Sequence, residues 1–145
     1  MPKLLKMVVE IKKQLELPCG YVVENRIAKA PLTEHLANED NNPNQYHYNL
    51  YRRWAKSKAG IILTGNIMID RNNIESEGNV VIDSYKQLPL LKKWVDAGGY
   101  NLWLQIGHAG ALSNSDRPLS PSVRPTSLRT YQPVRLFAVS RIVLH

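Results

Sequence analysis

The sequence predicts an α/β fold in which parallel strands alternate with helices. Three short apolar runs, at residues 27–32, 61–69 and 100–110, have the length and composition of buried strands. Two helix-like segments with recognisable end signals lie between these runs. This alternation is the βαβ pattern of a parallel sheet, because parallel neighbours are joined by a crossover that is usually a helix. A chain of 145 residues is long enough for one such domain.

The first strand of the sheet is predicted at Ile27–Leu32, after a shorter strand at Tyr21–Val23. Pro31 has no N–H to donate to a ladder, so it marks the end of the first strand. Thr33 then carries the first side-chain hydroxyl beyond that end. The polar residues 34–42 are predicted to form a loop.

The first helix is predicted to start at Asn42–Pro43, with Asn as the N-cap and Pro at the first helical position. Gly60 is predicted to follow the end of this helix. The apolar face is predicted from side chains at four-residue spacing, which are expected to pack in the core. These side chains are Tyr46, Leu50 and Trp54.

The second and third strands flank a second helix. Gly65 interrupts the strand predicted at Ile61–Ile69, which indicates either a bulge or a flat group packed against the backbone. Asp83–Ser84 predicts the cap of the second helix, which ends at Gly98. Its apolar face is predicted to consist of Leu88, Leu91 and Val95. The third strand lies within Tyr100–Gly110 and is predicted to be buried.

A polar or small residue stands at or near the end of each predicted strand: Thr33, Gly65 and Gln105. Gln105 interrupts an apolar run, and a buried amide needs a hydrogen-bond partner. That partner is either a neighbouring group of the protein or a polar ligand. In a barrel of parallel strands, these three positions would meet at the rim where such folds keep their binding sites.

Charge and composition exclude several classes of protein. The net charge of +7 comes from residues 1–13, with +3, and residues 124–145, with +4, so the segment between them is neutral. A nucleic-acid-binding domain would carry a basic patch on its folded body, so nucleic acid is not an expected partner. No apolar run is long enough to span a membrane, and residues 1–20 lack a signal peptide. With one cysteine, Cys19, the expected compartment is the cytoplasm.

Common catalytic motifs are absent. The chain has no Gly-rich dinucleotide fingerprint, Walker loop or nucleophile elbow, and its histidines have no zinc-site spacing. His35 and His47 are predicted to lie on the surface. His108 follows the third strand without a carboxylate nearby in sequence, which fits a structural role at least as well as catalysis. No catalytic residue and no metal ligand is therefore predicted.

Six segments in order resemble the N-terminal part of the old yellow enzyme family, the FMN-dependent NAD(P)H:flavin oxidoreductases that include NADH oxidases. The resemblance covers about residues 15–125, and its strength lies in the order and spacing of the segments rather than in any one of them. These segments are Leu17–Gly20, Asn25–Glu34, Tyr51–Ala55, Leu63–Asp70, Gly78–Val81 and Gln105–Gly110.

The resemblance implies about three βα units of a (β/α)8 TIM barrel, with FMN at the carboxyl-terminal rim. It implies that NAD(P)H reduces FMN, which then reduces an activated alkene such as an α,β-unsaturated carbonyl compound. Ala30, Pro31 and Thr33 would contact the isoalloxazine ring, with Thr33 near a flavin carbonyl. Gly65 would offer its backbone to the ring's polar edge, and Gln105 would hydrogen-bond the pyrimidine portion.

The ends of the chain depart from the family pattern. Residues 1–14 are expected to be a helical or disordered leader, and residues 126–145 a basic tail that matches nothing in the family. The family's substrate-binding pair, either two histidines or a histidine and an asparagine, and its phosphate-binding basic residues lie on later strands that have no counterpart here. We therefore expect a weakly active or inactive oxidoreductase. The alternative is a non-enzymatic remnant or a protein that depends on a partner chain; its oligomeric state is left open.

Overall fold

The structure, a computed structural model, describes residues 10–115, 119–120 and 132–133. Of the predicted leader, only residues 10–14 are described, with Glu10 and Ile11 helical. Of the predicted basic tail, only Gln132–Pro133 is described. The elements are β1 (Leu15–Glu16), β2 (Val22–Val23), β3 (Ala28–Lys29), α2 (Gln45–Ala55), β4 (Ile61–Met68), β5 (Val80–Val81), η1 (Tyr85–Gln87), α3 (Leu88–Gly98), β6 (Leu102–Gly107), η2 (Gly110–Leu112), β7 (Leu119–Ser120) and β8 (Gln132–Pro133).

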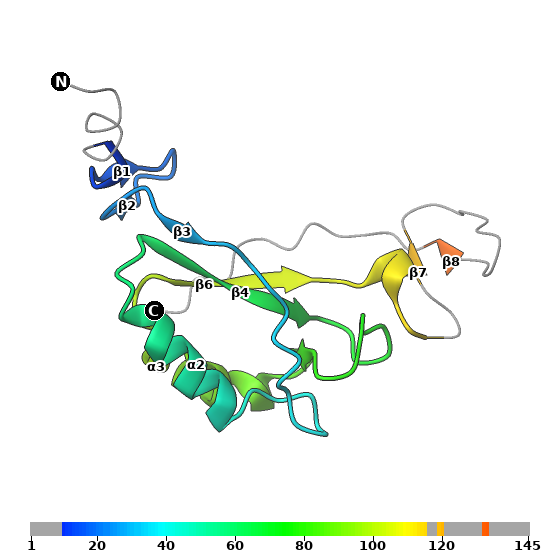
Figure 1. The fold of residues 1–145 in the computed structure, drawn as a ribbon. Coiled ribbons are helices and arrows are strands. Elements are labelled where there is room, and N and C mark those ends of the chain that lie inside the picture. The colour runs from blue at the N-terminus through cyan, green and yellow to red at the C-terminus, as the bar shows by residue number, and fades with distance from the viewer. Residues whose placement is uncertain (1–9, 116–118, 121–131, 134–145) are drawn as a thin grey trace.

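The main sheet is parallel and is centred on β4, as the alternating pattern predicts. One edge of β4 pairs with β6, and the other edge pairs with β3 at its start and with β5 at its end. A separate antiparallel hairpin, β1–β2, lies near one end of the sheet (Figure 1). β7 and β8 form a third, two-stranded parallel pair.

Helices α2 and α3 pack against each other and lie on one face of the main sheet (Figure 1). The core lies between these helices and the sheet. Leu102 and Leu104 of β6 contact this core, so the alternation of a strand turns Trp103 and Gln105 toward the other face. The buried core consists of Tyr48, Tyr51, Ala59, Ile62, Ile67, Val80, Leu91, Trp94 and Leu102.

The start, end and buried face of α2 differ from prediction. Asn44, not Asn42, is the N-cap, and Lys56 is the C-cap, so Gly60 does not directly follow the helix end as predicted. Asn44 forms a capping box with His47, since its side chain accepts backbone N–H groups while the His47 ring accepts the N–H of Asn44. The buried face holds His47, Tyr48 and Tyr51.

Two side chains predicted to pack in the core are exposed instead, Tyr46 by 71% and Trp54 by 39%, and Leu88 on the apolar face of the second helix is exposed by 37%. The prediction that His47 lies on the surface is also wrong, because it is fully buried, whereas His35 is exposed as predicted. Four-residue spacing alone selected the wrong stripe of α2, because a histidine that caps the helix start can be buried with its ring against an aromatic side chain.

The remaining elements follow the sequence signals in part. Ser84 caps η1, which runs directly into α3, and α3 ends at Gly98 with Gly99 at φ 79°, a left-handed conformation that favours glycine. β3 is shorter than predicted, with two residues. The sequence predicts a buried β6, but only Leu102 is buried and the rest of the strand is half-buried. The reason is that the described helices cover only one face of the sheet. None of the helices described is long and apolar enough to cross a membrane.

Candidate functional site

The carboxyl ends of β3, β4 and β6 meet at one edge of the main sheet, because all three strands run parallel. The residues at and just beyond these ends are 30–34, 65–70 and 105–110. In parallel α/β folds this edge is where ligands bind. We call it the rim.

Three of the five predicted cofactor-binding residues come together at this rim. A Cβ atom added to Gly65 would lie 2.6 Å from the Cα of Thr33 and 2.5 Å from the carbonyl oxygen of Leu32, so the segment after β3 crosses directly over β4. Gln105 lies opposite Asn66, the residue after Gly65. Ala30 and Pro31 precede this crossing and are exposed.

Gly65 combines both features that sequence allowed, a bulge and a close approach. The register of the β4–β6 ladder shifts between Leu63 and Asn66. The Gly65 N–H donates to Oε1 of Glu34 at 3.0 Å, and the Thr64 hydroxyl donates to the Gly65 carbonyl at 2.9 Å. The group that approaches the backbone is the chain's own segment, and both Gly65 backbone groups are hydrogen-bonded within the chain.

Thr64 also fixes the position of Gln105. Its fully buried hydroxyl oxygen accepts the backbone N–H of Gln105 at 2.9 Å. The side-chain amide of Gln105 is half-buried, and no residue in the described part of the chain hydrogen-bonds to it. The half-buried Thr33 hydroxyl is likewise without a partner among the residues described. These two groups are therefore available to a polar ligand.

Glu34 and Tyr51 are rim-associated residues that sequence reasoning missed. The buried Tyr51 hydroxyl donates to Oε1 of Glu34, the oxygen that also accepts the Gly65 N–H. Burial, together with the Glu34 carboxylate, raises the pKa of Tyr51 well above its usual range. Glu34 directly follows Thr33, but no local pattern marks a loop carboxylate that bonds to a helix 17 residues later.

Lys29 adds a cation to this cluster. Its Nζ donates to the Leu63 carbonyl at 2.9 Å and lies 5.5 Å from the ring centre of Tyr51 and 5.6 Å from that of Trp54. Burial lowers the pKa of Lys29, while the Glu34 carboxylate opposes that shift.

His108 has a carboxylate partner that local sequence did not reveal. Its Nε2 lies 3.6 Å from Oδ2 of Asp70, which follows the neighbouring strand β4. The Gly110 N–H donates to Nδ1 at 2.9 Å, so the neutral ring carries its proton on Nε2, facing Asp70. Partial burial would raise the pKa of Asp70, but the Asn72 N–H, the Asn73 amide and His108 together lower it.

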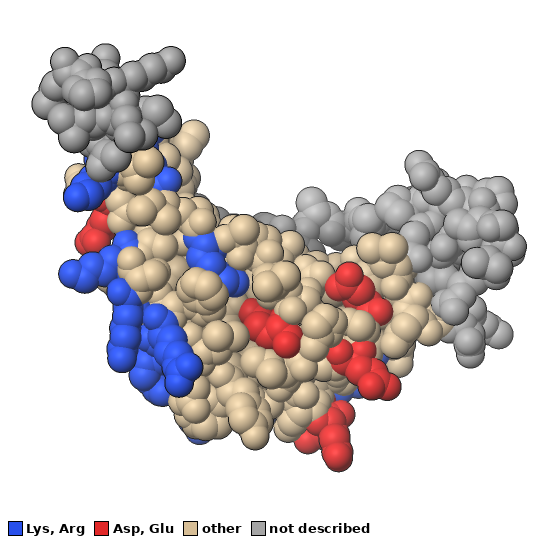
Figure 2. All heavy atoms as spheres, in the orientation of Figure 1, with Lys and Arg blue, Asp and Glu red and all other residues tan. Residues whose placement is uncertain are grey.

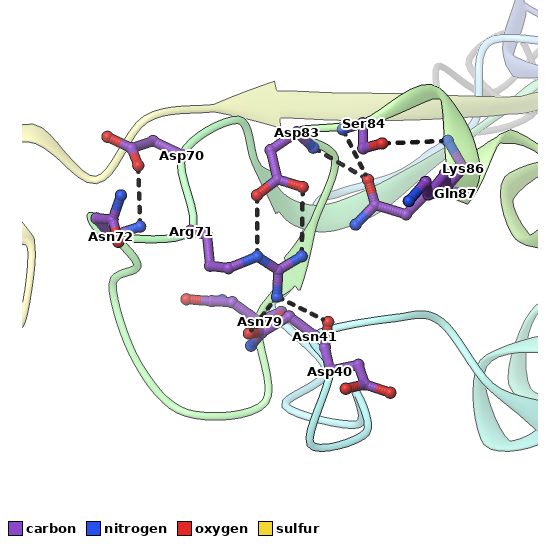
Figure 3. A network of polar contacts seen from close by, with 10 residues as sticks. All are labelled: Asp40, Asn41, Asp70, Arg71, Asn72, Asn79, Asp83, Ser84, Lys86 and Gln87. Carbon is purple, nitrogen blue, oxygen red and sulfur yellow. Dashed lines mark hydrogen bonds and ion pairs between the residues drawn. The ribbon is translucent and has the colours of Figure 1, made fainter.

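Arg71 joins three loops at the rim (Figure 3). Its guanidinium binds Asp83 through two nitrogens, at 3.0 and 3.3 Å, and donates at 3.0 Å to the carbonyl of Asp40 and at 3.4 Å to Oδ1 of Asn41. The planar donor set of arginine suits such a multidentate arrangement. Arg71 thus holds together the loop before α2, the loop after β4 and the loop after β5.

Charge is distributed unevenly over the face of the molecule that Figure 2 shows. On the face shown, lysines and arginines gather toward the end where α2 terminates, and acidic side chains lie toward the rim. Arg52 and Arg53 occupy the last turn of α2. Within the described residues, no group of three or more histidine, cysteine or acidic side chains could hold a metal ion.

Comparison with known proteins gives consistent relatives. The chain is 32% identical over 108 residues to the NADH-dependent flavin oxidoreductase iliE of Neonectria sp., and 33% identical over 133 residues to the NADH-dependent flavin oxidoreductase nadA of Aspergillus parasiticus. These matches cover 70% and 81% of the chain, and the chain spans 14% and 30% of the two relatives. No family model matches the chain.

Solved structures share the fold. The old yellow enzyme from Trypanosoma cruzi matches with a TM-score of 0.63 and 31% identity over 74% of the chain and 29% of its own. TcOYE with pHBA matches with a TM-score of 0.70 and 25% identity over 89% of the chain and 43% of its own. The described sheet and helices thus correspond to part of a TIM barrel, and by sequence and fold the chain is a relative of the old yellow enzymes and NADH-dependent flavin oxidoreductases.

Proposed function

We propose that the rim of this chain contacts the isoalloxazine ring of FMN in an oxidoreductase of old yellow enzyme type. The observation that carries the proposal is the convergence of Thr33, Gly65 and Gln105 from three strand ends, with the Gln105 amide unpaired among the described residues. An amide offers both a donor and an acceptor, which suits the alternating polar atoms of a flavin edge.

Each rim residue has a distinct task in this proposal. Gln105 hydrogen-bonds the pyrimidine edge of the ring, and Thr33 presents its hydroxyl to a ring carbonyl. Gly65 has no side chain, which lets the segment that carries Thr33 cross β4 directly, and its own N–H is donated to Glu34. Ala30 and Pro31, exposed just before the crossing segment, provide apolar contact to the ring.

The redox chemistry would come from bound FMN, which takes a hydride from NAD(P)H and passes it to an activated alkene such as an α,β-unsaturated carbonyl compound. The names of the relatives, NADH-dependent flavin oxidoreductases, support a nicotinamide as the reductant and a flavin as the cofactor. The residues of this chain bind and orient the ring. The same proposal includes an activated alkene as the substrate class, FMN as the flavin and a cytoplasmic location.

We expect a polypeptide limited to these 145 residues to bind FMN weakly and to show little or no activity. A complete barrel of this type takes about 250 residues and eight strands, which together enclose the ligand. Stoichiometric flavin absorbance in the purified polypeptide would contradict this expectation.

The proposal can be tested by titrating the chain with FMN up to millimolar concentrations while recording amide chemical shifts by NMR. We expect saturable shifts at Thr33, Gly65 and Gln105, and a Gln105→Leu variant that binds about tenfold or more weakly, because it leaves the polar ring edge unpaired. Asn49→Leu, an amide on the exposed face of α2, serves as the control. Absence of shifts at the rim, or equal affinity in Gln105→Leu, would contradict the proposal.

One observation supports the alternative of a partner-dependent, non-enzymatic protein. Among the described residues, β6 pairs only with β4, so its outer edge offers unpaired backbone groups. This alternative predicts mixed assembly or aggregation by gel filtration, whereas a compact monomer that melts cooperatively would count against it.

A further inference from the structure

The β4 bulge leaves backbone groups without partners in the strand ladder. The register shift between Leu63 and Asn66 places Gly65 outside regular pairing with β6. Buried backbone groups that leave a ladder need other partners, and side chains can supply them. Side chains from neighbouring segments supply partners for this bulge.

Two charged side chains from the segment around β3 bind the bulge from one side. Lys29 donates to the Leu63 carbonyl at 2.9 Å, and Glu34 accepts the Gly65 N–H at 3.0 Å. Thr64 completes the arrangement by donating to the Gly65 carbonyl and accepting the N–H of Gln105. The bulge is thus held by side-chain hydrogen bonds rather than by a ladder.

Glu34 differs from the other two because it connects the bulge to a helix. The oxygen that accepts the Gly65 N–H also accepts the hydroxyl of Tyr51, which is fully buried in α2. Hydrogen bonds to an ionised acceptor are shorter and stronger than those between neutral groups. The position of the Glu34 carboxylate is therefore determined by two donors on different elements.

This connection fixes the crossing segment over β4. Thr33 precedes Glu34, and its Cα, together with the Leu32 carbonyl, lies against the position where a Gly65 side chain would be. If the carboxylate were removed, the Gly65 N–H and the Tyr51 hydroxyl would both lose their acceptor. The crossing segment would then lose its hydrogen-bonded link to β4 and α2, while keeping its van der Waals contact with Gly65.

We propose that Glu34 is a positioning residue for the flavin-facing rim. Through the Tyr51–Glu34–Gly65 hydrogen bonds it holds Thr33 and the β4 bulge in the relative positions that contact the ring. The flavin part of this inference rests on the proposed function, whereas the positioning of Gly65 does not. Neither Glu34 nor Tyr51 transfers a proton or hydride in this role.

The test compares Glu34→Gln, Glu34→Leu and Tyr51→Phe in the full 145-residue chain. Glutamine keeps an acceptor for both donors, leucine removes it, and phenylalanine removes only the helix donor. Glu39→Leu is the matched control, because Glu39 is an exposed carboxylate in the same loop. The first readout is the hydrogen-exchange rate of the Gly65 amide in flavin-free protein, with the Trp94 amide of α3 as an internal reference.

We expect Gly65 exchange to rise about tenfold or more in Glu34→Leu and severalfold in Tyr51→Phe, because the amide or its acceptor loses a hydrogen bond. Glu34→Gln and Glu39→Leu should stay within about threefold of wild type, since both keep an acceptor at this position. If Glu34→Leu does not fold, the contrast between Tyr51→Phe and Glu34→Gln decides. Unchanged Gly65 exchange in Tyr51→Phe would then overturn the proposal.

The second readout is the Kd for FMN from the rim amide shifts, which should weaken about tenfold in Glu34→Leu and recover in Glu34→Gln. The two proposals fail in different ways. If wild type gives no FMN-dependent shifts, the proposed function fails and so does the flavin part of this inference, while Gly65 exchange still tests the contact. If wild type binds FMN but Gly65 exchange is equal in Glu34→Leu and Glu39→Leu, only the positioning role is refuted.

Discussion

At the scale of single residues, His47 is a histidine that the fold keeps uncharged. It is fully buried against the edge of the Trp94 ring, at 4.7 Å between ring centres. Its Nδ1 accepts the Asn44 N–H, and its buried Nε2 has no hydrogen-bond partner within the described residues. Burial lowers the pKa of His47 to about 4, with a smaller opposing effect of Glu34.

This residue predicts a pH-dependent stability. Between the folded pKa of about 4 and the ordinary histidine pKa of 6.5, the unfolded chain binds a proton that folded His47 does not. Stability should therefore fall as the pH drops through this window, by on the order of 3 kcal/mol in total. His47→Gln should show a clearly shallower dependence in urea unfolding between pH 4.5 and 7.5. An identical dependence in the variant would contradict this assignment.

Any side chain added at Gly65 should clash with the segment that crosses β4. Alanine at this position would place its Cβ 2.5 Å from the Leu32 carbonyl oxygen and 2.6 Å from the Thr33 Cα, which are backbone atoms that cannot rotate away. We expect Gly65→Ala to lower the free energy of unfolding by about 2 kcal/mol or more.

The matched control for this substitution is Gly107→Ala, at the end of the neighbouring strand. A Cβ at Gly107 meets nothing within 4 Å, so this variant should change stability by less than about 1 kcal/mol. Chemical denaturation of both variants provides the comparison. Equal losses would show that the crossing segment does not restrain Gly65.

Sequence reasoning reached Thr33, Gly65 and Gln105 because each interrupts or ends an apolar run, which is a local signal. It did not reach Glu34 or Tyr51, because their bond joins a loop to a helix and neither residue breaks its local pattern. The partnership of His108 with Asp70 was missed for the same reason, since parallel strands bring together residues that are far apart in the chain.

At the scale of elements, the start of α2 shows how a single side chain selects a helix boundary. Asn42 and Asn44 both precede Gln45, and Asn42 is followed by Pro43, so the sequence favoured the wrong one. In the fold, the Asn44 side chain accepts the Tyr46 N–H at 2.9 Å and donates to the Leu36 carbonyl at 2.6 Å. The tertiary bond to Leu36 could not be read from the local sequence.

We predict that Asn44→Ala lowers the free energy of unfolding by about 1–2 kcal/mol, because the helix start loses its cap. Asn42→Ala should cost less, since Oδ1 of Asn42 is buried without a hydrogen-bond partner in the described part of the chain. Thermal unfolding followed by circular dichroism can compare the two variants. A greater loss in Asn42→Ala would place the functional cap where the sequence pattern suggested.

The Arg71 contacts predict a modest but specific contribution from the rim loops. The pair with Asp83 is partly exposed, with 43% and 27% of the two side chains accessible, so Arg71→Ala should cost only about 1 kcal/mol. Arg71→Lys should not restore the lost stability, because an ammonium group cannot reproduce the planar set of donors.

Lys92→Ala is the control for this prediction. Lys92 pairs with Asp96 on the exposed surface of α3, with side chains 76% and 59% accessible. Lys92→Ala should therefore leave the free energy of unfolding almost unchanged. Urea denaturation of the three variants gives the measurement. Full recovery in Arg71→Lys would show that charge alone holds the loops together.

At the scale of the whole molecule, the separation of charge bears on which flavin the chain can hold. The rim carries Glu34 and Asp70, Arg71 is already paired with Asp83, and Lys29 donates to the Leu63 carbonyl. Lysines and arginines on the face shown gather toward the opposite end (Figure 2). The described rim therefore suits the neutral ring of a flavin better than its phosphate.

We predict that this chain binds riboflavin and FMN with Kd values within about threefold of each other, since a single charge-assisted hydrogen bond to phosphate would produce a larger difference. Parallel titrations at one ionic strength, followed by amide shifts, give the two constants. A Kd for FMN at least tenfold lower would show that the chain supplies a phosphate site of its own.

The overall architecture was predictable because the alternation of apolar runs and capped helices encodes a parallel sheet. The two-residue strands β1, β2 and β5 were only partly accessible to this reasoning, since Leu15–Glu16 and Val80–Val81 are too short to show a periodicity. Their pairing depends on tertiary neighbours, which a propensity argument does not contain.

The central position of β4 has a further consequence for the order in which the molecule assembles. β3 and β5 share one edge of β4, each over two residues, and neither is paired with the other. β6, by contrast, pairs with β4 along most of the length of the opposite edge, and α3 connects the two strands in the chain. We therefore expect the β4–α3–β6 unit to form early in folding and the crossing segment that shapes the rim to settle late.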